Sequence, residues 1–184
     1  MLISAGLFLS WSQSSTTSTN QPVVSESPTI ETFSSEPVKI EESLLRPTDK
    51  EKQSFEPPVR IVVSDLSIDL PVKEAKVVSG YWEVFPDVAG FGLGSSYPGE
   101  VGNQVIFAHA RAGLFFPLKN AKVGQKVIVF TQDKWYSYAI TDIKEVNPNQ
   151  IEVIAPTQDV TLTLYTCSGF ADSKRLIVTA KPVS

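Results

Sequence analysis

The sequence predicts an all-β domain, either a mostly antiparallel barrel or a sandwich, preceded by a segment that forms no core. The first observation is a series of seven or eight short apolar stretches between residues 59 and 183. The second is the recurrence of Gly, Pro and Asn turn signals between them, with little helical periodicity. The third is a change at residues 12–56 to a composition rich in Ser, Thr, Pro and Glu. We therefore place a domain of about 125 residues at 57–184.

Residues 1–11, MLISAGLFLSW, form an apolar N-terminal segment. It is shorter than the roughly 20 residues of a spanning helix, and no Lys or Arg precedes it as in a signal peptide. Two interpretations stay open, the remnant of a membrane anchor and a disordered apolar end. Residues 12–56 cannot bury enough apolar surface to offset their ordering entropy, so we expect a disordered tether. The two segments together are typical of a stalk that holds a domain away from a membrane.

The first half of the domain predicts three strands. The stretches VRIVV (59–63) and LSIDLPV (66–72) are strand-like, and Pro71 indicates a sheet edge or a strand end. Residues 78–102 are dense in Gly and Pro, and we expect a long loop-rich stretch there. NQVIFAHA (103–110) predicts a buried strand that carries His109 at its end.

The second half predicts a hairpin, a loop and two closing strands. GLFFPLKNAKVG (113–124) contains a single helical turn in this interpretation. QKVIVFT (125–131) and KWYSYAITDIKEV (134–146) have the spacing of a hairpin. NPNQIEVIAPTQD (147–159) is a loop with an apolar middle, and VTLTLYTC (160–167) and RLIVTAKPV (175–183) are the last strands.

The charge and the numbers of Cys and His exclude several classes of protein. The 184 residues carry a formal net charge of -4, whereas a nucleic-acid binder needs a basic face. The single Cys excludes an internal disulfide, and one Cys with one His cannot supply the ligands of a Cys/His zinc site. If the single Cys and the single His act together, nucleophile and general base are the most economical roles for them.

Cys167, His109 and Arg175 each stand at the end of a predicted strand. Cys167 ends an alternating run, and there a nucleophile has rigid backbone behind it and open space ahead. If the last two strands are neighbours, Arg175 reaches the space above the thiol, where a guanidinium favours a thiolate and binds an oxyanion. The plainer interpretations are a buried apolar Cys, a structural His and a solvated Arg.

Four segments in the same order resemble the sortases, the cysteine transpeptidases of Gram-positive cell surfaces. Thr163, Leu164, Thr166 and Cys167 match the T-L-x-T-C signature of that family. PGEVGNQVIFAH resembles the family's run into its histidine, and FFPLKNAKVGQKVIVF resembles the segment that follows. WYSYAITDIKEVNP resembles the strand before the substrate-sorting loop, and the resemblance covers residues 59–183.

The resemblance implies a closed β-barrel of about eight strands with short helical turns. It implies His109, Cys167 and Arg175 as the catalytic residues of a cysteine transpeptidase. Such an enzyme cuts an LPxTG-type sorting signal between Thr and Gly, forms a thioacyl-enzyme and transfers the protein to an amine acceptor, a peptidoglycan cross-bridge amine or a pilin lysine. The implied reaction needs no metal or organic cofactor. We expect a monomer on the extracellular face of the cell membrane, anchored through its N-terminus, with no nucleic-acid partner.

The resemblance also implies a substrate groove floored by the strands that end in His109 and Cys167, with Ala108 and Thr166 beside them. Its apolar wall comes from five residues that suit a Leu-Pro segment: Ile151, Val153, Ile154, Ala155 and Pro156. The same side chains can also pack the loop onto the barrel.

Some features depart from the family's usual pattern. Ala108 stands where a Gly usually precedes the histidine, residues 147–159 leave no room for the long helix of some classes, and no aromatic lid motif precedes the domain. These features predict a compact class D-like, class E-like or unassigned sortase. Two other functions stay open, a sortase-fold thiol hydrolase without transfer and a catalytically silent surface β-domain that binds proteins.

Overall fold

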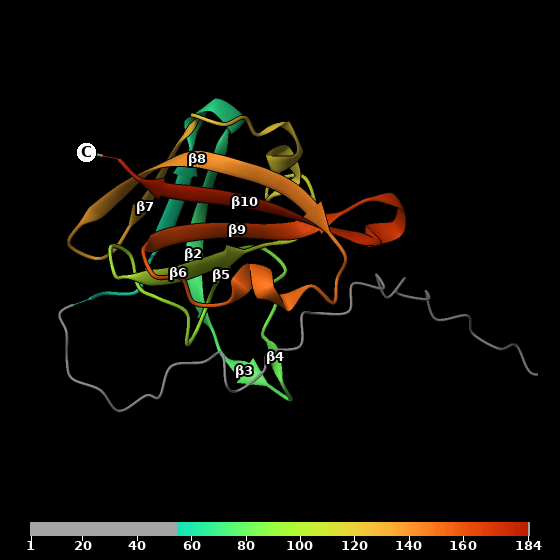
Figure 1. Ribbon diagram of the computed structural model, residues 1–184, viewed down its shortest axis with the longest axis horizontal. Coiled ribbons are helices and arrows are strands. Elements are labelled where there is room, and N and C mark those ends of the chain that lie inside the picture. The colour runs from blue at the N-terminus through green and yellow to red at the C-terminus, as the bar shows by residue number, and fades with distance from the viewer. Residues whose placement is uncertain (1–54, 184) are drawn as a thin grey trace, which may run out of the picture. The chain divides into compact units, whose positions relative to one another are not determined.

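A computed structural model describes residues 55–183 of the chain (Figure 1). The predictions for residues 1–11, and for the 12–56 tether up to residue 54, lie outside the described residues. At the start of the described part, the carboxylate of Glu56 accepts a hydrogen bond from the Asp133 N–H at 3.2 Å.

Eight strands close into a barrel in the order β1-β2-β5-β6-β9-β10-β8-β7. Their bounds are Arg60–Val63 (β1), Ile68–Ala75 (β2), Ala89–Gly92 (β5), Gly102–Phe107 (β6), Lys126–Phe130 (β7), Trp135–Val146 (β8), Val160–Ser168 (β9) and Lys174–Pro182 (β10). Short 3-10 turns lie between them, at Ser64–Leu66 (η2), Phe116–Asn120 (η3), Ile151–Ile154 (η4) and Phe170–Asp172 (η5). The predicted closed barrel with short helical turns is therefore confirmed, and the sandwich is excluded.

Two of the neighbouring pairs in this barrel are parallel. β2 runs parallel to β5, and β6 runs parallel to β9 with Phe107 opposite Tyr165 (Figure 1). Parallel neighbours end at the same edge of a sheet, whereas antiparallel neighbours end at opposite edges. The residues that follow β6 and the last residues of β9 therefore reach the same rim of the barrel.

The interior of the barrel is filled by alternate residues of the strands. Leu162, Leu164 and Thr166 of β9 are all buried, as the alternation predicted. A hydrogen bond between two buried side chains crosses this core. The Tyr138 hydroxyl donates to the Gln104 side-chain oxygen at 3.3 Å. Burial raises the pKa of Tyr138 to about 12, so this hydroxyl keeps its proton.

The stretch 78–102, predicted to be loop-rich, also contains the barrel strand β5, which the sequence pattern did not indicate. It also contains β4 (Tyr81–Trp82), which pairs with β3 (Val77–Val78) in a two-stranded hairpin. The glycines that obscured β5 are needed for close packing: a Cβ on Gly92 would lie 2.5 Å from the Trp82 ring, and one on Gly90 would lie 2.8 Å from Phe107.

Of the two roles predicted for Pro71, a sheet edge or a strand end, the strand end is wrong, because β2 continues to Ala75. The Val72 N–H donates to the Val59 carbonyl, so the neighbouring nitrogen of Pro71 faces away from β1. On that side, pairing with β5 begins only at Val72. The missing N–H therefore costs no bond in the barrel.

A second apolar cluster covers the outer face of β6 and β9. Its buried members are Ala75, Val105, Phe107 and Ile154, with Val77, Trp82, Phe85, Val153 and Tyr165 packed against them. The Trp82 ring stacks on Phe107 with centroids 5.5 Å apart, and its N–H donates to the Leu93 carbonyl at 3.0 Å. The β3-β4 hairpin and the η4 turn are held against the barrel by this cluster.

Candidate active site

One rim of the barrel brings together the ends of β6, β9 and β10. His109 lies two residues after the last residue of β6, and Cys167 is the second-last residue of β9. Arg175 of β10 is the cross-strand partner of Cys167, which confirms that the last two strands are neighbours. Directly paired residues project from the same face of a sheet. The thiol and the guanidinium therefore leave the barrel on the same side.

Arg175 is a buried cation, with only 2% of its surface exposed. Its Nη1 donates to the carbonyls of Asp172 at 2.7 Å and Lys174 at 2.9 Å, and its Nε donates to the Tyr165 hydroxyl at 2.8 Å. A buried charge is tolerated only where hydrogen bonds replace its hydration. These contacts make Arg175 a fixed part of the rim, unlike the solvated surface charge of the plainer interpretation.

His109 is half-buried, and its surroundings favour the neutral imidazole. Burial lowers the pKa of His109 below its ordinary value, the nearby positive charge of Arg111 lowers it further, and the carboxylate of Asp172 opposes both. The His109 carbonyl also accepts a hydrogen bond from the Phe115 N–H at 3.0 Å, which ties the histidine to the segment leading into η3.

The turn between β9 and β10 has an unusual backbone. Gly169 has a φ of 77°, Ala171 of 50° and Asp172 of 58°, all in the left-handed region. For Ala and Asp this conformation carries a cost of order 1 kcal/mol each. The Arg175 bond to the Asp172 carbonyl helps to hold the turn in this conformation.

Thr166 and Ala108 connect the two parallel strands on the inner side of the rim. The Thr166 hydroxyl donates to the Ala108 carbonyl at 2.7 Å, and both residues are buried. The Ala108 N–H donates to the Tyr165 carbonyl at 3.3 Å. These bonds fix the backbone just before His109 relative to the backbone just before Cys167.

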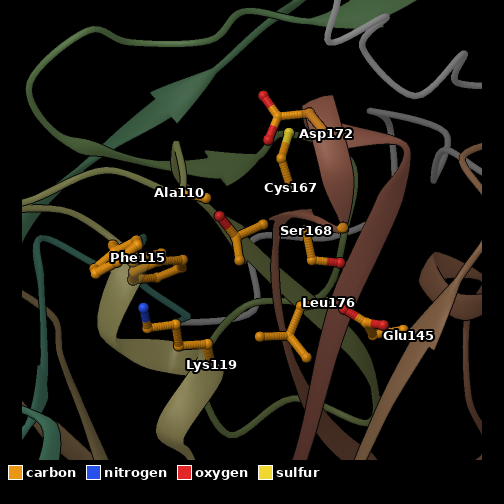
Figure 2. A pocket seen from close by; sticks show the side chains of 11 residues that line it. Ala110, Phe115, Lys119, Glu145, Cys167, Ser168, Asp172 and Leu176 are labelled. Atoms are coloured by element: carbon orange, nitrogen blue, oxygen red, sulfur yellow. The ribbon is translucent and has the colours of Figure 1, made fainter.

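A pocket of about 510 Å³ opens beside Cys167 at this rim. It is lined by Ala110, Phe115, Phe116, Lys119, Glu145, Thr166, Cys167, Ser168, Gly169, Asp172 and Leu176. Figure 2 shows Cys167 and Asp172 together at one end, with Phe115 and Lys119 on one side and Glu145 on the other. The Ser168 hydroxyl is buried and has no hydrogen-bond partner within the structure. The pocket thus offers an apolar interior with the carboxylates of Glu145 and Asp172 and the ammonium of Lys119 at its edge.

The five residues predicted as a substrate wall lie outside this pocket, on the η4 side of the site. Ile154 is buried in the second apolar cluster, and Val153 packs against that cluster. Ile151 and Ala155 are half-buried, and Pro156 is exposed. The side chain of Asn103 donates to the Val153 carbonyl at 3.2 Å and to the Ala155 carbonyl at 3.1 Å. The loop is therefore packed onto the barrel.

Sequence reasoning missed several residues at the site, among them Tyr165, Asp172 and Asn103, and the pocket residues Glu145 and Ser168. Tyr165 was assigned only as the variable position of the signature, Asp172 only as part of a connecting loop, and Asn103 only as the start of a strand. Tyr165 and Asp172 could have been found from the sequence, because both lie close to Cys167 along the chain. Nothing near Asn103 in the sequence indicates its role, because its hydrogen-bond partners are separated from it by 50, 52 and 60 residues.

Two further features bear on the chemistry and the surroundings of the domain. Between residues 55 and 183, no three His, Cys, Asp or Glu side chains gather in a way that could hold a metal ion. The same residues include no helix with the length and apolar character needed to cross a membrane.

Comparison with known proteins shows to which family the chain belongs. The protein-family model described as a sortase domain matches residues 61–183. The chain belongs to the sortase family. Sortase A of Streptococcus agalactiae is 32% identical over 133 residues, which cover 66% of this chain and 51% of that protein. Sortase A of Bacillus anthracis is 29% identical over 127 residues, which cover 65% of this chain and 56% of that protein. This sortase therefore spans about half the length of the curated relatives it matches.

Solved structures show the same fold. Sortase C-1 from Actinomyces oris superposes on this sortase with a TM-score of 0.59 at 26% identity, covering 69% of this chain and 75% of that chain. Relatives named sortase A and sortase C thus both resemble the chain. The predicted sub-class remains a prediction.

Proposed function

We propose that this sortase is a cysteine transpeptidase that cleaves an LPxTG-type sorting signal and joins the released protein to an amine acceptor. One observation carries the proposal. The parallel pairing of β6 with β9 delivers the unique His and the unique Cys to one rim, where Arg175 is the cross-strand partner of Cys167. A nucleophile, a base and an anion-binding group in one place support acyl transfer.

In the proposed first step, the thiolate of Cys167 attacks the carbonyl carbon of the signal's Thr. The carbonyl oxygen becomes an oxyanion, and the guanidinium of Arg175 stabilises it. His109 as imidazolium gives a proton to the departing Gly amine, the C–N bond breaks, and a thioester with Cys167 remains. Because burial lowers the pKa of His109, only a minor fraction of the enzyme holds imidazolium beside a thiolate near neutral pH.

In the second step, an acceptor amine attacks the thioester. Neutral His109 takes a proton from that amine, the C–S bond breaks, and the Cys167 thiolate is restored. We place the acceptor in the pocket beside Cys167, because the two carboxylates of Glu145 and Asp172 outnumber the ammonium of Lys119 there and attract a cationic amine before it loses its proton.

The sorting signal would lie on the other side of Cys167, along the η4 turn. Ile151, Val153, Ala155 and Pro156 would form its apolar wall, and the buried Ile154 would support that wall from the barrel side. Substrates translocated to the cell surface would meet the domain on the outer face of the membrane, held there through the N-terminal segment and tether.

The proposal is tested with fluorogenic LPxTG-type peptides, with and without an amine acceptor, beside Cys167→Ala. We expect cleavage that depends on Cys167 and an amide adduct with the acceptor. Cleavage without any adduct would favour the thiol hydrolase. Absence of Cys167-dependent cleavage across a panel of peptides would favour the silent binding domain and overturn the proposal.

A further inference from the structure

Tyr165 shares a face of the barrel with Cys167 and Arg175. It stands two residues before Cys167 on β9, and alternate residues of a strand point to the same side. In the β9-β10 register, Cys167 faces Arg175 while Tyr165 faces Ile177. Tyr165 and Arg175 are therefore diagonal neighbours across the two strands, within reach of long side chains.

The hydroxyl of Tyr165 holds one edge of the guanidinium. It accepts the Arg175 Nε–H at 2.8 Å. At the other side of the group, Nη1 donates to the carbonyls of Asp172 and Lys174. Those two bonds hold the Nη1 end of the group, and the bond at Nε holds the edge next to the Cδ stem. Tyr165 is therefore the side chain among these three contacts that orients the Nε edge of the guanidinium plane.

Tyr165 is itself fixed by the second apolar cluster. Its ring packs against that cluster, which includes Phe107 and Ile154. Burial raises the pKa of Tyr165 to about 12, and the charge of Arg175 only partly opposes this. The hydroxyl therefore stays protonated over the physiological range, and its lone pair accepts the arginine bond without forming a second ion.

We propose that Tyr165 is a positioning residue whose hydroxyl sets the orientation of the Arg175 guanidinium beside Cys167. This inference rests on the role given to Arg175 under the proposed function. It assigns a purpose to the variable position of the T-L-x-T-C signature in this chain. A Tyr here links the packing around η4 to the group that stabilises the oxyanion.

The test compares Tyr165→Phe with Tyr138→Phe. Both substitutions remove one hydroxyl and keep the ring, and both hydroxyls are hydrogen-bonded inside the protein. The Tyr138 hydroxyl donates to Gln104 and accepts the Gly99 N–H at 3.2 Å, in the barrel interior. Tyr138→Phe therefore controls for the general effect of losing a buried hydroxyl on stability.

We expect Tyr165→Phe to lower kcat for peptide cleavage by about tenfold or more, because a misplaced catalytic group costs up to 10²-fold. KM should change by less than about twofold, since the interaction acts in the transition state. Tyr138→Phe should keep the wild-type kcat below its melting temperature. In an Arg175→Lys background, which lacks the Nε donor, Tyr165→Phe should have little further effect. An equal kcat in Tyr165→Phe and wild type, or full additivity with Arg175→Lys, would overturn the inference.

A second measurement separates this inference from the proposed function. The rate of Cys167 alkylation by iodoacetamide at neutral pH needs no peptide substrate. A fixed guanidinium beside the thiol favours the reactive thiolate, so Tyr165→Phe should react about threefold or more slowly than wild type, and Tyr138→Phe should not. If wild type cleaves no peptide, the transpeptidase proposal fails while alkylation still tests Tyr165. Equal alkylation rates in all three proteins would reject the positioning role.

Discussion

Asn103 should hold the η4 turn against the barrel, and its replacement by Ala should loosen that turn. The Asn103 side chain is buried and makes three hydrogen bonds. Its Nδ2 donates to the carbonyls of Val153 at 3.2 Å and Ala155 at 3.1 Å, and its Oδ1 accepts the Thr163 hydroxyl at 2.7 Å. Two of the partners belong to the η4 segment and the third to β9, so a single side chain joins both.

The magnitude follows from these three bonds. Each buried hydrogen bond contributes about 1 kcal/mol net, so Asn103→Ala should cost about 3 kcal/mol of unfolding free energy. For a domain of about 125 residues this corresponds to a fall in Tm of roughly 10 °C. Urea unfolding should show a lower midpoint with an unchanged slope, since the surface exposed on unfolding is nearly the same.

Asn103→Asp tests the reasoning with the shape preserved. A carboxylate cannot donate to the carbonyls of Val153 and Ala155, and near neutral pH it would repel both. We expect a loss of stability at pH 7 at least as large as that of the Ala variant, with partial recovery in acid as the carboxyl gains a proton to donate. Hydrogen exchange of residues 147–159 should rise in both variants. Wild-type stability of Asn103→Asp at pH 7 would refute the assignment of these bonds.

Two further predictions follow from the packing and the electrostatics. Gly92→Ala should displace the Trp82 indole, because the added Cβ would lie 2.5 Å from the ring. We expect red-shifted tryptophan fluorescence and a lower Tm in this variant. An unchanged fluorescence spectrum would contradict the described packing of Trp82 on Gly92. For His109, whose folded-state pKa burial lowers, the unfolded chain takes up the proton first as the pH falls, so stability drops below about pH 6.5. His109→Asn should therefore lose less Tm than wild type between about pH 7.5 and pH 5.5, and identical slopes would show that His109 is not buried as described.

Much of the barrel could be predicted from local patterns, because the strands that frame the site alternate or carry buried apolar runs. The β9 and β10 strands and the β7-β8 hairpin are confirmed close to their predicted bounds. The strand β5 was missed because its sequence, AGFG, has the composition of a turn. Only the rings of Trp82 and Phe107, which come from other parts of the chain, explain why glycine is needed there.

The site was predictable to the extent that strand ends carry unusual residues. His109, Cys167 and Arg175 became candidate site residues because the chain has one His and one Cys, and because each of the three closes or opens a predicted strand. The parallel pairing of β6 and β9, which brings two of them to one rim, is a long-range property that no local pattern contains. Tyr165 and Asn103 depend on the same long-range register, so their contacts could be described only from the structure.

The position of β10 in the barrel has a consequence for the order of folding. This strand lies between β8 and β9 and pairs with both, so the barrel cannot close before it is inserted. A nascent chain synthesised only as far as Ser173 already contains the cysteine and the histidine, yet it lacks the strand that carries the arginine. We therefore expect Cys167 to gain Arg175 as its neighbour only after β10 has been synthesised and inserted.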